Sequence, residues 1–201
     1  QGSAWWSEGW GIFREATGLW VGMAFALVAL FVVIGMIPVL GALATYLIAP
    51  IFSGGLMLGC RNLESGQGLS FGHLFAGFQK NLGQLALVGV LYLVGILVIG
   101  AGIAVLGLGA GFGAALIGGA SPGASFSSIM LVGLIGAGLM IPLAMAIWFA
   151  PALVMLNDLP AVAAMKLSFS GCLRNMLPFL VYGLIGMVLA IAASLPLALG
   201  W

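Results

Sequence analysis

The sequence predicts an all-α protein that crosses a membrane about five times, with two further helices at the membrane surface. The 201-residue chain is 64% hydrophobic and only 4% charged, whereas soluble domains carry about 25% charged residues. Its mean hydropathy is +1.31. Apolar runs of about 20 residues, the length that a helix needs to span the hydrocarbon core, recur along the chain. Lipid can solvate such a surface and water cannot, and a net charge of +1 does not favour a nucleic-acid partner.

Five apolar segments are long enough to span a bilayer. The first two are separated by a turn at Pro38 and Gly41, and no charged residue occurs between Gly18 and Cys60. A kink is expected in the fourth segment at Pro151, which lacks the backbone N–H that a helix needs there. The predicted spans are residues 18–38, 41–60, 82–106, 126–149 (continuing to 156) and 177–195.

A glycine-rich segment, residues 107–124, lies between the third and fourth spans. It is apolar but contains turn residues at Gly118, Gly119, Ser121, Pro122 and Gly123. An external loop, a re-entrant segment and an additional short span are all compatible with this composition.

Two short amphipathic segments interrupt the apolar pattern. In residues 71–80, Phe71, Leu74, Phe75 and Phe78 fall on one helical face. Residues 161–175 have the same character. We expect both to lie in the headgroup region as interfacial helices.

The cations predict the topology. With five spans and a cytoplasmic N-terminus, all five Lys and Arg residues fall on the cytoplasmic side, as the positive-inside rule requires. A sixth span within 107–124 would place two of them outside. The cations are Arg14, Arg61, Lys80, Lys166 and Arg174.

The two amphipathic segments resemble each other, which indicates an internal duplication. "FAGFQKNL" from Phe75 and "FSGCLRNM" from Phe169 share Phe, Gly and Asn at a constant offset, with Lys80 matched by Arg174. The repeats cover about residues 18–106 and 126–199 of a single transmembrane domain, 4–201. We expect the matched glycines to allow close packing and the matched asparagines to satisfy the backbone at each bend into the next span. These helix-bend positions are Gly77, Asn81, Gly171 and Asn175.

Two sets of candidate site residues follow from this arrangement. Prolines and glycines within spans predict broken helices that line a cavity, with ordinary kinked packing as the alternative. Cations beside the spans predict contacts with lipid headgroups. The cavity candidates are Pro50, Gly54, Gly55, Pro142 and Pro151, and the headgroup candidates are Arg61, Lys80, Lys166 and Arg174.

No pattern in the sequence predicts a catalytic centre, a metal or a cofactor. All titratable carboxylates and cations, and His73, fall outside the predicted spans, which argues against a proton-coupled transporter. A single histidine cannot build a bis-histidine haem or a histidine-based zinc site. Cys60 and Cys172 lack metal-ligand spacing, and we expect free thiols.

Three stretches resemble known membrane proteins. "EGWGIFREATGLWVGM" and "PIFSGGLMLGCRNLESGQGLSFGHLFAGF" are similar to a group of proteobacterial multi-pass inner-membrane proteins with no assigned reaction. "AAMKLSFSGCLRNMLPFLVYGL" more remotely resembles the membrane domains fused to glycerophosphodiester phosphodiesterases. The phosphodiesterase barrel and its metal ligands are missing from this sequence, so that activity is not carried over. The resemblance implies a membrane location and no assigned reaction. It also implies a further C-terminal segment, and "QGS" at the start resembles a tag remnant.

Two functions remain open at this point. One is passive or facilitated passage of a neutral or amphipathic molecule through a cavity at the repeat interface. The other is a membrane scaffold, accessory subunit or lipid-organising protein that acts through the two amphipathic helices. Membrane lipids are the expected partners in both cases, and a homo-oligomer is compatible with either.

Overall fold

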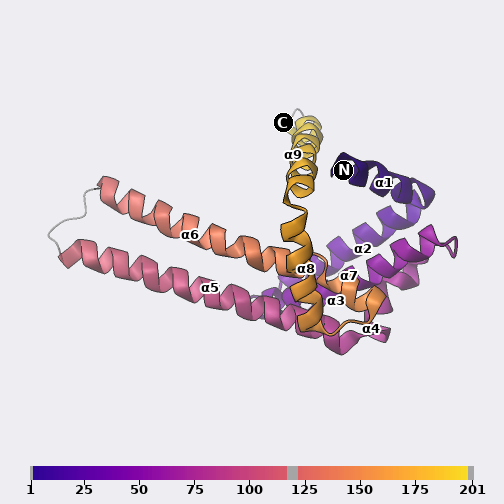
Figure 1. Ribbon diagram of the computed structural model, residues 1–201, viewed down its shortest axis with the longest axis horizontal. Helices are drawn as coiled ribbons and strands as arrows, with labels where there is room; N and C mark the ends of the chain where they lie inside the picture. The colour runs from indigo at the N-terminus through magenta and orange to yellow at the C-terminus, as the bar shows by residue number, and fades with distance from the viewer. Residues whose placement is uncertain (1, 117–121, 199–201) are drawn as a thin grey trace.

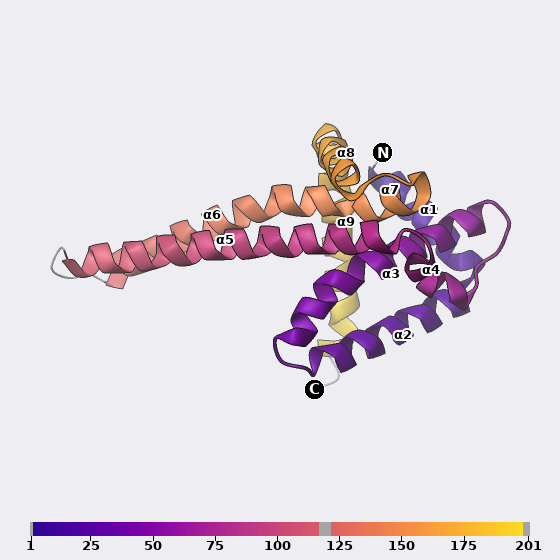
Figure 2. The same cartoon turned by 90° about the horizontal axis from the view of Figure 1, so that it is seen from below.

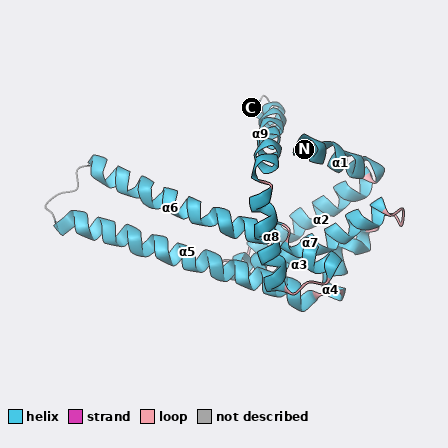
Figure 3. Cartoon of the chain, in the orientation of Figure 1, coloured by secondary structure: helices cyan, strands magenta, loops and turns pink. Residues whose placement is uncertain are grey.

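The computed structural model describes residues 2–116 and 122–198, and within these ranges every regular element is a helix (Figure 3). The prediction of an all-α membrane protein is confirmed. The helices are α1 (Gly2–Glu15), α2 (Thr17–Gly35), α3 (Leu40–Glu64), the 3₁₀ helix η1 (Phe71–Phe75), α4 (Ala76–Gln79), α5 (Leu82–Leu116), α6 (Pro122–Trp148), α7 (Ala150–Asn157), α8 (Ala161–Arg174) and α9 (Met176–Ala198).

Four stretches of helix are long and apolar enough to cross a membrane in the described part of the chain. They agree with the first four predicted spans, because uninterrupted apolar runs satisfy their backbone hydrogen bonds internally in lipid. The fifth predicted span corresponds to α9, which meets α8 at an angle of 82°. The four stretches are Thr17–Gly35, Leu40–Glu64, Leu82–Gly109 and Met130–Asn157.

The glycine-rich segment forms no separate span where it is described. Residues 107–116 continue α5, and residues 122–124 begin α6. The third span is therefore longer than the predicted end at Leu106. Turn residues 118, 119 and 121 lie outside the described residues. Figures 1 and 2 both show α5 and α6 side by side as a long hairpin that extends away from the other helices.

Two short elements differ from the predictions. The tryptophan-rich N-terminal residues form the helix α1, which was not among the predicted elements. Residues 71–80 are not one amphipathic helix but the 3₁₀ helix η1 followed by the single turn of α4. A side-chain cap at Ser70 favours the tight turn, because its side chain and that of His73 satisfy each other's backbone amides.

The buried core lies where α3, α5, α7 and α8 meet. Leu85, Val88 and Val154 are fully buried there. A smaller cluster of Met23, Phe52 and Leu74 joins α2, α3 and η1. Side chains outside these clusters are largely exposed, as expected where lipid is the solvent.

Both proposed repeats contain a proline-containing long helix, a polar break, a short helical segment and a long helix, in that order, but the first also includes α2 and the second has α7 before its break. They differ in packing. A Cβ on Gly77 would collide with the Ile51 carbonyl of α3, whereas nothing lies within 4 Å of a Cβ on Gly171. The duplication stays a prediction, and its two halves pack differently.

Candidate functional site

The end of α7 is held by three side chains from the first half of the chain. Arg61 Nη1, Lys80 Nζ and Asn81 Nδ2 donate to the carbonyls of residues 156, 155 and 154, at 3.1, 3.2 and 3.0 Å. The last four carbonyls of a helix have no partner within it, and the helix dipole makes that end negative. All three side chains therefore supply hydrogen-bond donors to the unpartnered carbonyls of α7. The two cations also interact favourably with the negative end of the helix dipole.

The turn after α7 is fixed by the same group of residues. Asp158 has left-handed backbone, with φ of 52°, and its carboxylate is 3.1 Å from Lys80 Nζ and 2.7 Å from Asn81 Nδ2. These two hydrogen bonds, led by that of Asn81, lower the pKa of Asp158 below its usual value of 3.8. Gln84 Oε1 accepts from Ala161 N at 2.8 Å and caps the start of α8. We call Arg61, Lys80, Asn81, Gln84 and Asp158 the clasp.

A second polar contact explains the break between α6 and α7. The buried Ser168 hydroxyl of α8 donates to the Met145 carbonyl at 2.7 Å and accepts from Phe149 N at 3.0 Å. In an uninterrupted helix the Phe149 amide would bond the Met145 carbonyl directly. The hydroxyl is therefore inserted into the helix ladder, and insertion of this kind bends a helix.

A row of three hollows, which we call the groove, runs along α6 and α9. The first, of about 300 Å³, is aliphatic and continues to Trp148 and Phe179. The second, of about 420 Å³, shares those two rings and adds Trp5, Phe149 and Tyr182. The third, of about 220 Å³, shares Trp5 and Tyr182 and lies against α1. The aliphatic hollow is lined by Ile141, Ala144, Met145, Trp148, Cys172, Met176, Phe179 and Leu180.

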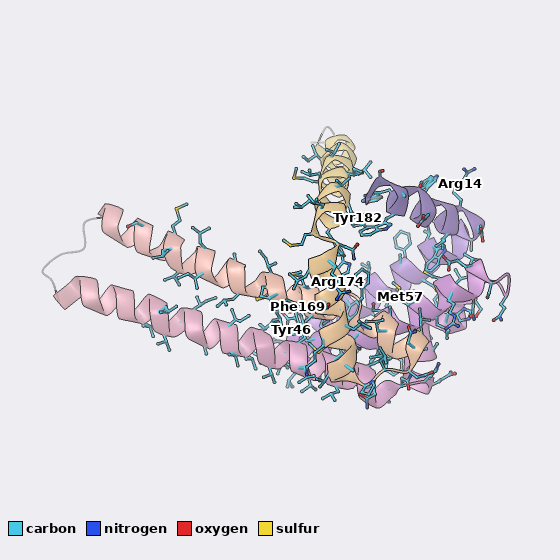
Figure 4. All side chains as sticks on the ribbon, in the orientation of Figure 1. Arg14, Tyr46, Met57, Phe169, Arg174 and Tyr182 are labelled. Atoms are coloured by element: carbon cyan, nitrogen blue, oxygen red, sulfur yellow. The ribbon has the colours of Figure 1, made fainter. Side chains whose placement is uncertain are left out.

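The aromatic end of the groove is built by α1 packing on α9. Trp6 Nε1 donates to the Tyr182 carbonyl at 3.1 Å, and the two rings stack with centroids 4.9 Å apart. Trp5 meets Phe179 edge to face at 5.3 Å. Figure 4 shows Tyr182 on the part of α9 nearest α1, and Arg174 at the junction of α8 and α9. Aromatic pairs in these geometries are favourable, so α1 is held against α9 mainly by rings.

One curated protein is similar to this chain over nearly its whole length. It comes from Burkholderia thailandensis, is named "Probable inner membrane protein", and is 31% identical over 208 aligned positions that include 98% of this chain and 76% of the relative. The chain belongs to this family of inner-membrane proteins. No family model matches the chain, and no solved structure matches it.

This inner-membrane protein is multi-pass, as its apolar helices indicate. The family supports the predicted location, and the cytoplasmic position of the N-terminus stays a prediction. The remote likeness to phosphodiesterase-fused domains finds no support in the matches and also stays a prediction.

The predicted cavity residues lie in two different environments. Pro50, Gly54 and Gly55 are buried in close packing, where a Cβ on Gly54 would approach Leu85 at 3.1 Å. Pro151 is also buried, at the start of α7, while Pro142 is exposed on α6. None of these residues lines the groove. The groove depends on tryptophans of α1, whose spacing at Trp6, Trp10 and Phe13 was the overlooked sign of a helix with one aromatic face.

The predicted headgroup contacts divide in the same way. Arg61 and Lys80 belong to the clasp, so their charges already have partners within the chain. Lys166 and Arg174 are exposed on α8, and neither side chain has a hydrogen bond or ion pair within the described residues. Of the four predicted headgroup contacts, these two are therefore the ones whose charges have no partner in the described part of the chain.

The two helix-bend asparagines act at different distances. Asn175 donates to the Gly171 carbonyl of its own helix, at 2.9 Å, whereas Asn81 reaches across to α7. Sequence reasoning placed both at bends but had no means of finding the long-range partner of Asn81.

The remaining polar residues have structural surroundings. His73 contacts Asn62 at 2.8 Å and the Ser70 amide at 3.0 Å, which places it at the cap of η1. Cys60 and Cys172 are free thiols, as predicted. Among the described residues, no group of three or more His, Cys, Asp or Glu could hold a metal ion.

Proposed function

We propose that this inner-membrane protein binds and organises lipid-like amphiphiles at the membrane surface, in the groove between α6, α8, α9 and α1. The observation that carries the proposal is the position of the hollows, which adjoin one another through shared aromatic residues along one side of the molecule. A narrow apolar groove of this kind suits an acyl chain, because it offers apolar contacts and few hydrogen-bonding groups.

The interface between the two proposed repeats supports binding over passage. Leu85 and Val88 of α5 and Val154 and Met155 of α7 are fully buried against one another there. Gly54 brings α3 close to α7 as well, since a Cβ at this position would approach Met155 at 3.5 Å. A passage route through this interface would have to open a packed core, which costs the contacts that hold α3 and α7 together.

The position of α8 supports a role at the membrane surface. Its buried face is formed by Ala161, Ala164, Ser168 and Cys172, at helical spacing. Lys166 and Arg174 are exposed beside exposed leucines, and this mixture suits a helix in the headgroup region. Arg174 lies between Cys172 and Met176, which both line the aliphatic hollow, so a cation lies close in sequence to the proposed acyl site. The proposal includes no catalytic step.

The test is native mass spectrometry of the protein released from gentle detergent, with identification of the molecules that co-purify. Ala144→Phe fills the aliphatic hollow, and Ala163→Phe, at an exposed position of α8 outside the groove, is the matched control. We expect a bound amphiphile on the wild type and on Ala163→Phe, and its loss from Ala144→Phe. Equal retention by all three proteins would contradict the groove as the binding site.

A further inference from the structure

We infer that the aromatic end of the groove takes the positively charged headgroup of an amphiphile, such as a quaternary ammonium group, while its chain occupies the aliphatic end. This inference rests on the proposed function, since it specifies the headgroup of the amphiphile proposed there. It assigns a ligand class to the hollows lined by Trp5, Trp148, Phe149, Phe179 and Tyr182, and by Trp6 and Trp10 beyond them.

The lining of these hollows favours a cation. The faces of aromatic rings are electrostatically negative and attract ammonium groups, most strongly for tryptophan. Every residue that lines the second hollow is aromatic, and in the third only Gly9 is not. No lysine or arginine lines either hollow, so an anionic headgroup would find no counter-charge there.

The surroundings of the third hollow agree with this sign of charge. The carboxylate of Glu8 is exposed on α1, one residue before the lining residue Gly9. The cation of α1, Arg14, lies at the end of this helix that is remote from α9 (Figure 4). Among the charged side chains of α1, Glu8 is therefore the nearest in sequence to the rings.

The rings are held in fixed positions, which a cation site of this kind requires. Phe179 contacts Trp5, Trp148 and Phe149 with centroids between 5.3 and 5.9 Å. Tyr182 stacks on Trp6, whose indole N–H is already used by the Tyr182 carbonyl. The ring faces do not need to rearrange around a partner, so little ordering cost is added on binding.

The order of the hollows sets the direction of the ligand. Ile141 and Leu180 lie at the aliphatic end, while Trp148 and Phe179 belong to both the aliphatic and the first aromatic hollow. An amphiphile whose chain follows Ile141 and Leu180 would bring its headgroup to the rings at the start of α9. Tryptophan and tyrosine are enriched at membrane–water interfaces, where amphiphile headgroups lie, and this enrichment suits a headgroup at these rings.

The test compares three amphiphiles that share a dodecyl chain and differ in the headgroup, namely trimethylammonium, maltoside and phosphate. Quenching or shift of tryptophan fluorescence is titrated with the full chain in nonionic micelles, with protein-free micelles as the blank. We expect the ammonium compound to bind about threefold to tenfold more tightly than the maltoside, as one or two cation–π contacts would give. The phosphate compound should bind more weakly than either.

Variants separate the headgroup effect from folding. Trp5→Leu and Tyr182→Leu should lower the ratio of ammonium to maltoside affinity toward one, while maltoside binding persists and reports an intact groove. Leu180 lines the aliphatic hollow, where the alkyl chain of the ligand would lie. Leu180→Ala should therefore weaken the binding of both compounds and leave the ratio of their affinities unchanged. Trp5→Phe should retain part of the ratio.

The outcomes distinguish the inference from the proposed function. Equal binding of the ammonium and maltoside compounds, or preference for the phosphate, would overturn the cation site and leave amphiphile binding standing. Saturable binding of none of the three by the wild type would overturn both. An ammonium preference that survives in Trp5→Leu and Tyr182→Leu would overturn the assignment to these rings.

Discussion

The Ser168 hydroxyl donates to the Met145 carbonyl at 2.7 Å and thereby replaces a backbone hydrogen bond of the α6–α7 helix. The same oxygen accepts the Phe149 amide that the carbonyl would otherwise have received. This side chain of α8 therefore contributes to the bend together with Pro151, which lacks a backbone N–H at the start of α7, and it fixes α8 against α6, where the groove begins.

Replacement of Ser168 tests this role. Ser168→Ala removes the acceptor of the Phe149 amide and leaves the Met145 carbonyl with only the weak Cys172 thiol donor at 3.5 Å. A buried polar group without a partner costs about 1–3 kcal/mol. We expect a lower apparent melting temperature, followed by circular dichroism in detergent. Ser170→Ala, on the same helix and without a side-chain hydrogen bond in the described structure, is the control. Equal melting of the two variants would show that the helix closes its own ladder when the hydroxyl is removed.

The matched glycines of the two proposed repeats should respond oppositely to alanine. A Cβ at Gly77 collides with the Ile51 carbonyl, so Gly77→Ala should destabilise the protein. A Cβ at Gly171 meets nothing within 4 Å, and alanine favours a helix over glycine by about 0.5–1 kcal/mol. Gly171→Ala should therefore be neutral or stabilising. The comparison is made by thermal unfolding, and similar losses at both positions would mean that the repeats pack alike.

Asn81 carries both backbone strain and long-range hydrogen bonds. Its φ is 60°, and its amide reaches Val154 and Asp158. Asn81→Gly loses the two hydrogen bonds but relieves the backbone strain, because glycine tolerates a positive φ. Asn81→Ala loses the same hydrogen bonds and keeps the strain. We expect Asn81→Ala to be less stable than Asn81→Gly, and both less stable than the wild type by about 1 kcal/mol or more. Asn175→Ala, whose amide bonds only its own helix, should cost less.

The clasp should weaken in acid. The folded-state pKa of Asp158 is lowered below 3.8, so the carboxylate stabilises the fold above its unfolded pKa. This stabilisation is lost as the pH falls through the lower, folded-state pKa. Melting temperatures measured between about pH 6 and about pH 2 should therefore fall at the acid end of the range. The fall should be smaller in Asp158→Asn, and an identical acid limb in that variant would assign the pH dependence to other carboxylates.

The cations should separate into stabilising and lipid-binding groups. Lys80→Gln removes a charge that is 3.1 Å from Asp158. This variant should lower the melting temperature and leave the binding of anionic lipid nearly unchanged. Lys166→Gln with Arg174→Gln removes two exposed charges without internal partners and should do the reverse, at about 1 kcal/mol of lipid binding for each charge. Melting curves and native mass spectra with added phosphatidylglycerol measure the two effects. Equal lipid loss in both proteins would contradict this division.

Local chemistry determined the class of this protein and most of its helices. The apolar runs from Thr17 to Gly35 and from Leu82 onward can satisfy their backbone only as helices in lipid, so their positions can be read from composition and length. The break after Asn157 is likewise local, since "NDLP" contains a left-handed Asp158 and a proline.

The tertiary structure alone decided which polar groups meet and where space remains. Lys80 and Arg174 occupy matched positions in the sequence, yet Lys80 is paired with Asp158 and Arg174 is exposed. Pro50 and Gly54 suggested a cavity but lie in close packing. The aromatic end of the groove forms where α1 meets α9, two helices from opposite ends of the sequence. Helix formation depends on neighbours within one turn, whereas partners and hollows depend on how whole helices pack, which residue spacing does not record.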